Sequence, residues 1–126
     1  MDMRNATDAL VDQQAAEVKT LAARLSVDTG MRIEIELVSR YAAISFHGKC
    51  IDAVARANQQ LGYSSMPVVS GAGHDAIYMT RLAPSGMIFI PCKDGISHNE
   101  VEDALPALIT AGCNVLLHAM LERANT

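Results

Sequence analysis

Two histidines in this sequence each follow an apolar stretch and a loop that contains glycine. His74 lies in the run Ser-Gly-Ala-Gly-His-Asp at residues 70–75. His98 lies near the end of the run Gly-Met-Ile-Phe-Ile-Pro-Cys-Lys-Asp-Gly-Ile-Ser-His-Asn at residues 86–99. Enzymes of the α/β class present reactive groups in this way, at the carboxyl ends of their strands. The two runs therefore predict where reactive groups would be displayed, although neither defines a site by itself.

The loop around His74 has two interpretations. Gly71 and Gly73 allow positive φ angles and a close approach of the backbone to a ligand. A helix that begins after the loop would direct its positive end at an anion or at a developing oxyanion, and His74 would then be functional. Alternatively, the segment is a tight turn from strand to helix in which Asp75 serves only as the N-cap. The residues alone leave both interpretations open.

The segment around His98 is equally open. A neutral imidazole after a strand and before a polar turn suits a metal ion such as zinc, and its second nitrogen can be held by a neighbouring group. However, Asn99 and Glu102 are three residues apart and also fit a short capped turn that has only a structural role.

The elements that must position these histidines follow from the periodicity of apolar residues. Steps of three and four predict a helix over residues 7–28 that ends at Thr29-Gly30. Alternation from Met31 to Leu37 predicts a half-buried strand, with the helix packed on the apolar face of its sheet. Residues 39–48 have no clean period and are the best candidate for a crossing between two structural units.

The second half of the chain is predicted to alternate between helices and short strands. The expected elements are a helix from about residue 51 to 61 closed by Gly62, a strand at 67–69, a helix at 75–82, a doubly buried strand at 87–90, and a last helix that starts near Leu105-Pro106. The residues expected on the inner faces of the first and last of these helices are Ile51, Val54, Ala55, Leu61, Leu108, Gly112, Val115, Leu116 and Ala119. His47 falls in the crossing, and His118 is expected on a helix face.

Composition excludes several classes of function. The chain has 126 residues, 50% of them apolar, with 10 basic and 14 acidic side chains and a net charge of −4. Five scattered aromatic residues form no stacking pattern, so no nucleic acid partner is expected. No apolar run approaches about 18 residues, so neither a membrane span nor a signal peptide is expected. Three cysteines without Cys-x-x-Cys spacing indicate reduced thiols and a cytoplasmic protein.

Three ordered motifs together resemble a known enzyme family. They are residues 70–76, residues 84–91, and residues 95–99 with Glu102. In this order they look like the C-terminal third of the zinc-dependent hydantoinase/carbamoylase amidohydrolases. That branch contains N-carbamoyl-L-amino acid hydrolase, allantoate amidohydrolase and β-ureidopropionase, within the aminoacylase and carboxypeptidase metallopeptidase superfamily. The resemblance covers nearly the whole chain.

The resemblance implies an α/β fold in two parts. Residues 1–44, a helix and a strand, would be the end of a lid or dimerisation domain. Residues 45–126 would be the C-terminal strands and helices of a metallopeptidase-like catalytic sheet.

The resemblance also implies roles for individual residues. His98 matches the last metal ligand of the family, and His74 matches a histidine that contacts substrate and stabilises the tetrahedral intermediate. Gly71, Gly73 and Asp75 would shape the substrate loop. The complete enzyme would use a divalent metal, zinc or manganese, to hydrolyse a small ureido or carbamoyl substrate, and it would form a homodimer or join a complementing N-terminal fragment. Glu100 departs from the family, which usually has proline there.

A larger departure is the absence of the other metal-binding motifs. The family holds its metal through a His-x-Asp motif, a bridging aspartate and a Glu-Glu pair, and this sequence contains neither a His-x-Asp nor a Glu-Glu. A catalytic zinc needs about three protein ligands, and its hydroxide chemistry also needs a general base. We therefore expect the isolated chain to bind metal weakly or not at all and to be inactive.

Three hypotheses follow from these observations. The chain is the C-terminal part of a metal-dependent amidohydrolase that hydrolyses a linear amide or carbamoyl C–N bond. Alternatively, it is a non-catalytic association module that uses residues 7–37 as a dimerising edge. The third hypothesis is a small α/β protein that binds an anion at the loop of residues 70–75, which we call the glycine loop.

Overall fold

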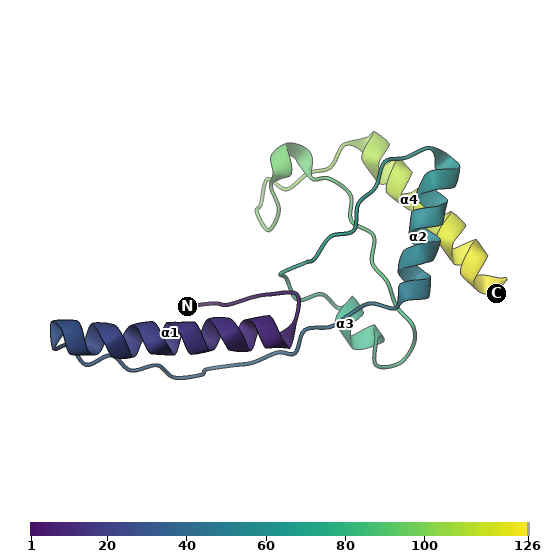
Figure 1. The fold of residues 1–126 in the computed structure, drawn as a ribbon. Coiled ribbons are helices and arrows are strands. Elements are labelled where there is room, and N and C mark those ends of the chain that lie inside the picture. Colours follow the sequence, from purple (N-terminus) through teal and green to yellow (C-terminus); the bar gives the residue numbers. More distant parts are fainter. Residues whose placement is uncertain (126) are drawn as a thin grey trace. The chain divides into compact units, whose positions relative to one another are not determined.

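The structure is a computed structural model that describes residues 1–125. It contains helices and connecting segments, and no strand is assigned within the described range. Figure 1 shows the elements in chain order. They are α1 (Asp8–Thr29), α2 (Gly48–Leu61), α3 (Ala76–Met79), the short 3-10 helix η1 (Lys93–Gly95) and α4 (Pro106–Ala124).

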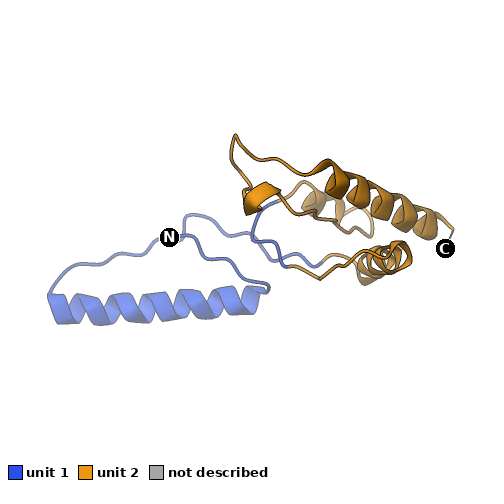
Figure 2. Cartoon of the chain, turned by 90° about the horizontal axis from the view of Figure 1, so that it is seen from above, with its two compact units in different colours: residues 1–45, 69–73 blue, residues 46–68, 74–126 orange. Residues whose placement is uncertain are grey.

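The chain divides into two compact units, which Figure 2 colours separately. Unit 1 comprises Met1–Ser45 and Val69–Gly73, and unit 2 comprises Phe46–Val68 and His74–Thr126. The division passes between Gly73 and His74, within the glycine loop. Whether these units correspond to the lid and catalytic parts expected at residues 1–44 and 45–126 stays a prediction.

In unit 1, helix α1 lies beside an extended segment. Thr7 caps its start by accepting a hydrogen bond from the Leu10 N–H at 3.3 Å, and Gly30 ends it with a left-handed φ of 70°. The segment after Gly30 runs back along the helix (Figure 1). It is held there by an ion pair between Arg40 and Asp12 and by a hydrogen bond of 2.8 Å from the Ala43 N–H to Asp8.

In unit 2, the packing of α2 against α4 forms the core. The buried apolar residues are Ala53, Ala57, Val115 and Ala119. Val54, Leu61 and Ile88 pack against them and are partly buried. An ion pair at the edge of the same interface joins Arg56 to Glu122. Because all four buried side chains are small, the two helices can approach closely, but they remove little apolar surface from water.

Most of the predicted helices are confirmed, with adjusted limits. Helix α1 begins and ends one residue later than the predicted helix. Gly62 closes α2 at a φ of 72°, and Pro106 occupies the first position of α4, both as predicted. The helix predicted at 75–82 is reduced to the single turn of α3, after which the chain continues in turns. No helix within residues 1–125 is long and apolar enough to cross a membrane.

The three predicted strands are absent from the described chain. Residues 31–37, 67–69 and 87–90 carry no strand assignment. A strand exists only when its backbone N–H and C=O groups pair with a neighbouring strand. No second strand is available within residues 1–125, so an apolar or alternating sequence is not sufficient to form a strand in this chain.

Several inner-face predictions were also wrong. Ile51 and Leu116 are about half exposed, and Ala55 is exposed as well. In α2 the buried apolar positions are Ala53 and Ala57, one turn apart, and the polar Asn58 is buried beside them. The small alanines allow close packing on α4, and the larger Ile51 lies outside this contact.

Candidate functional site

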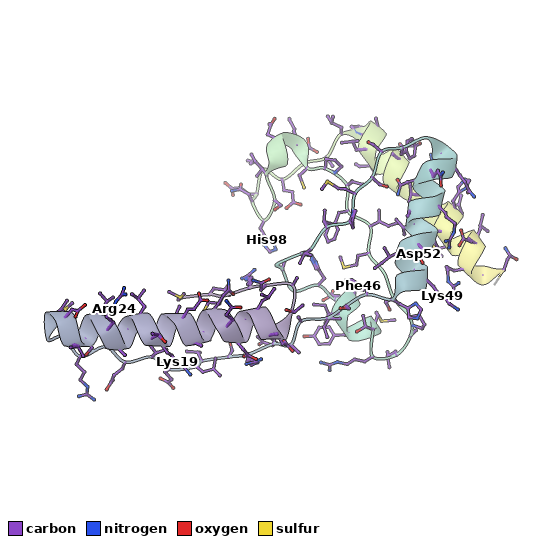
Figure 3. All side chains as sticks on the ribbon, in the orientation of Figure 1. Lys19, Arg24, Phe46, Lys49, Asp52 and His98 are labelled. Carbon is purple, nitrogen blue, oxygen red and sulfur yellow. The ribbon has the colours of Figure 1, made fainter. Side chains whose placement is uncertain are left out.

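His98 lies at the tip of the loop of residues 92–103, which contains η1, as Figure 3 shows. Its side chain is exposed, and its backbone has a φ of 55°. Asp94 and Gly95 in the same loop also have positive φ angles, of 56° and 70°. Left-handed backbone at two residues that are not glycine is uncommon and requires local support. The loop therefore turns sharply twice and presents the His98 imidazole to its surroundings.

Glu102 supplies that support for His98. Its Oε2 accepts a hydrogen bond from the backbone N–H of His98 at 2.7 Å, and its Oε1 lies 3.8 Å from the Sγ of Cys92. The Glu102 N–H in turn donates to the carbonyl of Asn99 at 3.0 Å. One carboxylate thus joins the tip of the loop to the residue where the loop begins, which fixes the backbone at His98.

The base of the loop is closed by a second pair of contacts. The N–H of Lys93 donates to the carbonyl of Asp103 at 2.7 Å, and the side chains of these two residues lie 3.9 Å apart. The Asn99 side chain accepts from the Val101 N–H at 3.1 Å, as a capping side chain does. The capped turn considered from the sequence is therefore present, and it holds His98 without using its imidazole.

His74 occupies a different environment in unit 2. It is half-buried, and its ring meets the ring of Phe89 edge to face, with centroids 5.5 Å apart and planes inclined at 63°. This geometry is favourable for aromatic pairs. Its carbonyl accepts from the Ile77 N–H at 3.0 Å, which ties it to the first turn of α3. Phe89 belongs to the apolar segment 87–90. This segment therefore contacts His74 and also leads into the loop that carries His98.

The glycine loop differs from the expectation at two points. Neither Gly71 nor Gly73 has a positive φ angle. A Cβ at Gly71 would lie 3.5 Å from the Arg4 side chain, an ordinary contact, and a Cβ at Gly73 would meet nothing. Asp75 precedes α3, but its side chain makes no capping hydrogen bond. Since α3 is a single turn, it provides little of the aligned dipole that an anion site at a helix end requires.

The remaining histidines have structural positions. His47 is the N-cap of α2, and its Nδ1 accepts from the Lys49 N–H at 3.2 Å. His118 lies exposed on α4, so its predicted placement on a helix face is confirmed. The contacts of His74 with Phe89 and of Cys92 with Glu102 were missed from the sequence, because both join residues that are ten or more positions apart.

Comparison with known proteins identifies the family of this chain. The sequence pattern of the family described as "Peptidase family M20/M25/M40" matches residues 3–122. The chain belongs to peptidase family M20/M25/M40. It is 40% identical to an N-carbamoyl-L-amino-acid amidohydrolase of Rhizobium meliloti over 98% of its own length and 30% of that protein. It is 31% identical to a ureidoglycolate hydrolase of rice, Oryza sativa subsp. japonica, over 95% of its length and 25% of that protein.

A solved structure shows the same relationship. The crystal structure of an amidase of the hydantoinase/carbamoylase family from Burkholderia multivorans matches 95% of this chain with a TM-score of 0.92 and 48% identity. The match covers 29% of that amidase. The resemblance found in the sequence is therefore confirmed at the level of the M20/M25/M40 family. The chain spans about 30% of the length of the relatives it matches.

The donor set of this M20/M25/M40 chain does not by itself fit a divalent metal. Within residues 1–125, no three His, Cys, Asp or Glu side chains converge closely enough to hold an ion. Glu102, in the same loop, already accepts from the His98 backbone N–H, and its other oxygen lies 3.8 Å from the Sγ of Cys92. The described residues around His98 therefore offer a metal ion no ligand set beyond this single imidazole.

Proposed function

We propose that this chain is the C-terminal part of a metal-dependent amidohydrolase of the M20/M25/M40 family. The complete enzyme would hydrolyse a linear C–N bond in a ureido or carbamoyl substrate, of the N-carbamoyl amino acid, ureido acid or allantoate class. The observation that carries this proposal is the 40% identity to an N-carbamoyl-L-amino-acid amidohydrolase across 98% of the chain. The chain alone would be inactive, because the described residues hold no complete ligand set.

Two histidines have proposed roles in that enzyme. His98 would provide one ligand for a divalent cation, zinc or manganese, and its exposed position at the loop tip leaves the imidazole accessible to a neighbouring polypeptide. His74 would contact the substrate and donate a hydrogen bond to the oxyanion of the tetrahedral intermediate. The edge-to-face contact with Phe89 would restrict its ring to one orientation, which is what a donor aimed at a developing charge requires.

The glycine loop would supply the wall of the substrate site. Gly71 and Gly73 would leave room for the substrate, since a Cβ at Gly73 would meet no atom of residues 1–125 within 4 Å. Asp75 would help to shape the loop. This role depends on open space at Gly73 rather than on positive φ angles.

The segments predicted as strands also have a place in the proposal. Residues 31–37, 67–69 and 87–90 would pair with strands supplied by the rest of the enzyme. Residues 1–44 would then complete a lid or dimerisation domain, and residues 45–126 a catalytic α/β domain. Their alternating or apolar sequences support this assignment.

A chimera tests the proposed function. The matching 29% of the Burkholderia multivorans amidase is replaced by residues 1–125 of this chain, and ammonia release from N-carbamoyl-L-amino acids, a ureido acid and allantoate is measured. We expect turnover of at least one substrate by the chimera and none by the isolated chain. A folded chimera that binds metal but hydrolyses none of the three classes would overturn the proposal.

Two substitutions in the same chimera test the site. His98→Ala should lower the bound metal and abolish hydrolysis. His74→Ala should leave the bound metal unchanged and lower kcat. His118→Ala is the matched control, because His118 is an exposed histidine on α4 outside the proposed site, and it should change neither quantity. Metal content and activity that remain unchanged in His98→Ala would contradict its assignment.

The alternative is a non-catalytic association module derived from the same family. The apolar side chains that residues 31–37 expose, including Met31, Ile35 and Leu37, favour it. Mass measurement in solution separates the two cases. A dimer formed by the isolated chain, together with an inactive chimera, would favour the module over the enzyme.

A further inference from the structure

Helix α2 begins at a histidine that serves as its N-cap. The His47 Nδ1 accepts a hydrogen bond from the Lys49 N–H at 3.2 Å. The His47 carbonyl accepts from the N–H groups of Cys50 and Ile51 at 2.9 and 3.2 Å. The first N–H groups of a helix have no partner within it, so a capping acceptor stabilises the helix. Because His47 is exposed, the cap of α2 depends on an imidazole that solvent can reach.

The same end of α2 is fastened to a turn that lies far away in the sequence, at residues 84–86. The His47 N–H donates to the Ser85 carbonyl at 2.9 Å. A Cβ at Gly86 would lie 3.0 Å from the Cβ of Cys50, so the first turn of α2 rests directly on this glycine. We call the His47 cap and these two contacts the α2 clamp. Loss of helical order at the start of α2 would release the turn of residues 84–86.

An imidazole can cap a helix only while it is neutral. The neutral ring has one nitrogen with a free lone pair, whereas the protonated ring has N–H donors at both nitrogens and accepts no hydrogen bond. Histidine is the side chain that ordinarily changes charge between about pH 5 and about pH 8. Helix α1 offers a contrast, because its cap is the hydroxyl of Thr7, which accepts from the Leu10 N–H and carries no charge in this range. A proton can therefore remove the cap of α2 but not that of α1.

The charges around His47 oppose a protonated ring. The titratable or charged side chains near it in α2 and before the turn of residues 84–86 are Lys49, Cys50, Asp52 and Arg81 (Lys49 and Asp52 are labelled in Figure 3). The first turn of α2 contains no acidic residue, and Lys49 adds a positive charge there. The helix N-terminus also carries partial positive charge, which disfavours a cation. The turn itself, Pro-Ser-Gly, has no titratable side chain, and Arg81 lies over the ring of Tyr78 at 5.6 Å. A proton on His47 would therefore remove the capping bond and place a second cation at this end of α2.

We propose that the α2 clamp is a pH-sensitive device that is closed near neutral pH and opens in mild acid. When Nδ1 of His47 takes up a proton, the Lys49 N–H loses its acceptor and the first turn of α2 loosens from the turn of residues 84–86. In the unfolded chain His47 has no such bond to lose, so the unfolded state takes up the proton more readily and stability falls as the pH falls. The turn leads into the segment 87–90, which contacts His74. The clamp itself does not depend on the proposed function.

Urea unfolding of the 126-residue chain at about pH 7.5 and about pH 5 tests the clamp. His47→Asn keeps a capping side chain but removes the group that titrates. Between the two pH values, the folding equilibrium constant of the unsubstituted chain should fall roughly 2- to 30-fold more than that of His47→Asn, the range that loss of an N-cap produces. His118→Asn is the matched control, because it removes an exposed histidine of α4 and should retain the full pH dependence. Equal pH dependence in the unsubstituted chain and in His47→Asn would overturn the proposal.

Nuclear magnetic resonance of the unsubstituted chain observes the clamp directly and needs no variant. At neutral pH, the ¹⁵N chemical shifts of the His47 ring should show the proton on Nε2 and a free lone pair on Nδ1. On acidification, hydrogen exchange corrected for its intrinsic pH dependence should accelerate at the amides of His47, Lys49 and Ile51 by the same factor as the loss in stability. The Val11 amide, bonded to the Thr7 carbonyl in α1, is the internal reference and should not change. A neutral ring with its proton on Nδ1, or equal protection of the α2 amides at both pH values, would overturn the proposal.

Discussion

The carboxylate of Glu102 holds the backbone of His98 in a left-handed conformation. The distance from the His98 N to Glu102 Oε2 is 2.7 Å, and the His98 φ is 55°. A hydrogen bond to an ionised carboxylate is stronger than one to a neutral acceptor. The bond therefore acts on the position of the imidazole without touching it, which makes Glu102 a positioning residue for the proposed ligand.

Glu102→Gln should loosen the His98 turn. The neutral amide oxygen is a weaker acceptor, so the His98 amide proton should shift upfield and exchange faster with solvent. In the chimera, metal affinity should fall roughly tenfold, the low end of the loss typical when a partner that orients a ligand is removed. Nuclear magnetic resonance of the amide and metal titration measure these effects.

Glu100→Gln is the matched control for that substitution. Glu100 lies in the same loop, is exposed, and loses the same charge. We expect the His98 amide and the metal affinity to stay unchanged. Equal effects of both substitutions would assign the result to loop charge and would contradict the positioning role of Glu102.

His98→Gly should separate stability from function. A left-handed backbone costs a residue other than glycine about 1–2 kcal/mol, whereas glycine adds about 0.5–1 kcal/mol of chain entropy to the unfolded state. The free energy of unfolding should therefore stay equal or rise by up to about 1.5 kcal/mol, although the imidazole and its proposed metal contact are lost. Urea unfolding of the 126-residue chain measures the first quantity, and metal content of the chimera the second.

His98→Val provides the opposite comparison. A β-branched side chain tolerates the left-handed region poorly, so this variant should unfold at lower urea concentration than both His98 and His98→Gly. If all three proteins unfolded at the same concentration, the loop would not be constrained at this residue.

The ion pair between Arg56 and Glu122 predicts a pH dependence for the α2–α4 packing. The Arg56 Nε lies 3.2 Å from both carboxylate oxygens of Glu122, and this hydrogen bonding lowers the pKa of Glu122 below its ordinary value of 4.5. A carboxylate with a lowered pKa in the folded state stabilises that state above its ordinary pKa. The contribution is lost as the pH falls below 4.5 and through the lowered pKa.

Glu122→Gln tests this dependence. The variant should be less stable than the unsubstituted chain at pH 7, and the difference should disappear as the pH falls below the lowered pKa of Glu122. Added salt should reduce the difference at pH 7, because the pair is partly exposed. Glu36→Gln, at an exposed carboxylate of unit 1, serves as control and should show no such pH dependence. A difference that persists unchanged at low pH would mean that packing, not charge, is lost.

The sequence predicts the parts of the fold that depend on local signals. Helix limits at Gly30, Gly62 and Pro106 follow from conformational preferences of single residues, and the structure confirms them. Strands depend on partners, and residues 31–37 have no partner strand within the described chain. Sequence alone therefore predicted their pattern but could not establish pairing.

The candidate site was predictable to a similar extent. The His98 loop and its capped turn follow from the local spacing of Asn99 and Glu102. The contact of His74 with Phe89 joins residues fifteen positions apart and depends on how the intervening turns fold. The exposure of Leu116 was mispredicted because α4 is apolar on two sides, so periodicity could not indicate which side α2 covers.

Gly112→Ala should destabilise the packing of α4, although alanine is the better helix former. A Cβ at residue 112 would lie 2.7 Å from Cγ2 of Ile90, a branched and stiff side chain that cannot easily turn away. Overpacking of this kind costs about 1–3 kcal/mol, whereas the gain in helix propensity is about 1 kcal/mol. The free energy of unfolding should therefore fall by up to about 2 kcal/mol in urea denaturation.

Two further variants make this prediction specific. Gly48→Ala places the same methyl group at the start of α2, where a Cβ meets no atom within 4 Å, and it should leave stability unchanged or raise it by up to about 1 kcal/mol. Ile90→Ala removes the clashing methyl group, so Gly112→Ala in that background should no longer destabilise the chain. Equal losses in both backgrounds would show that the methyl group at residue 112 does not meet Ile90, and the packing of the 87–90 segment on α4 would then be incorrect.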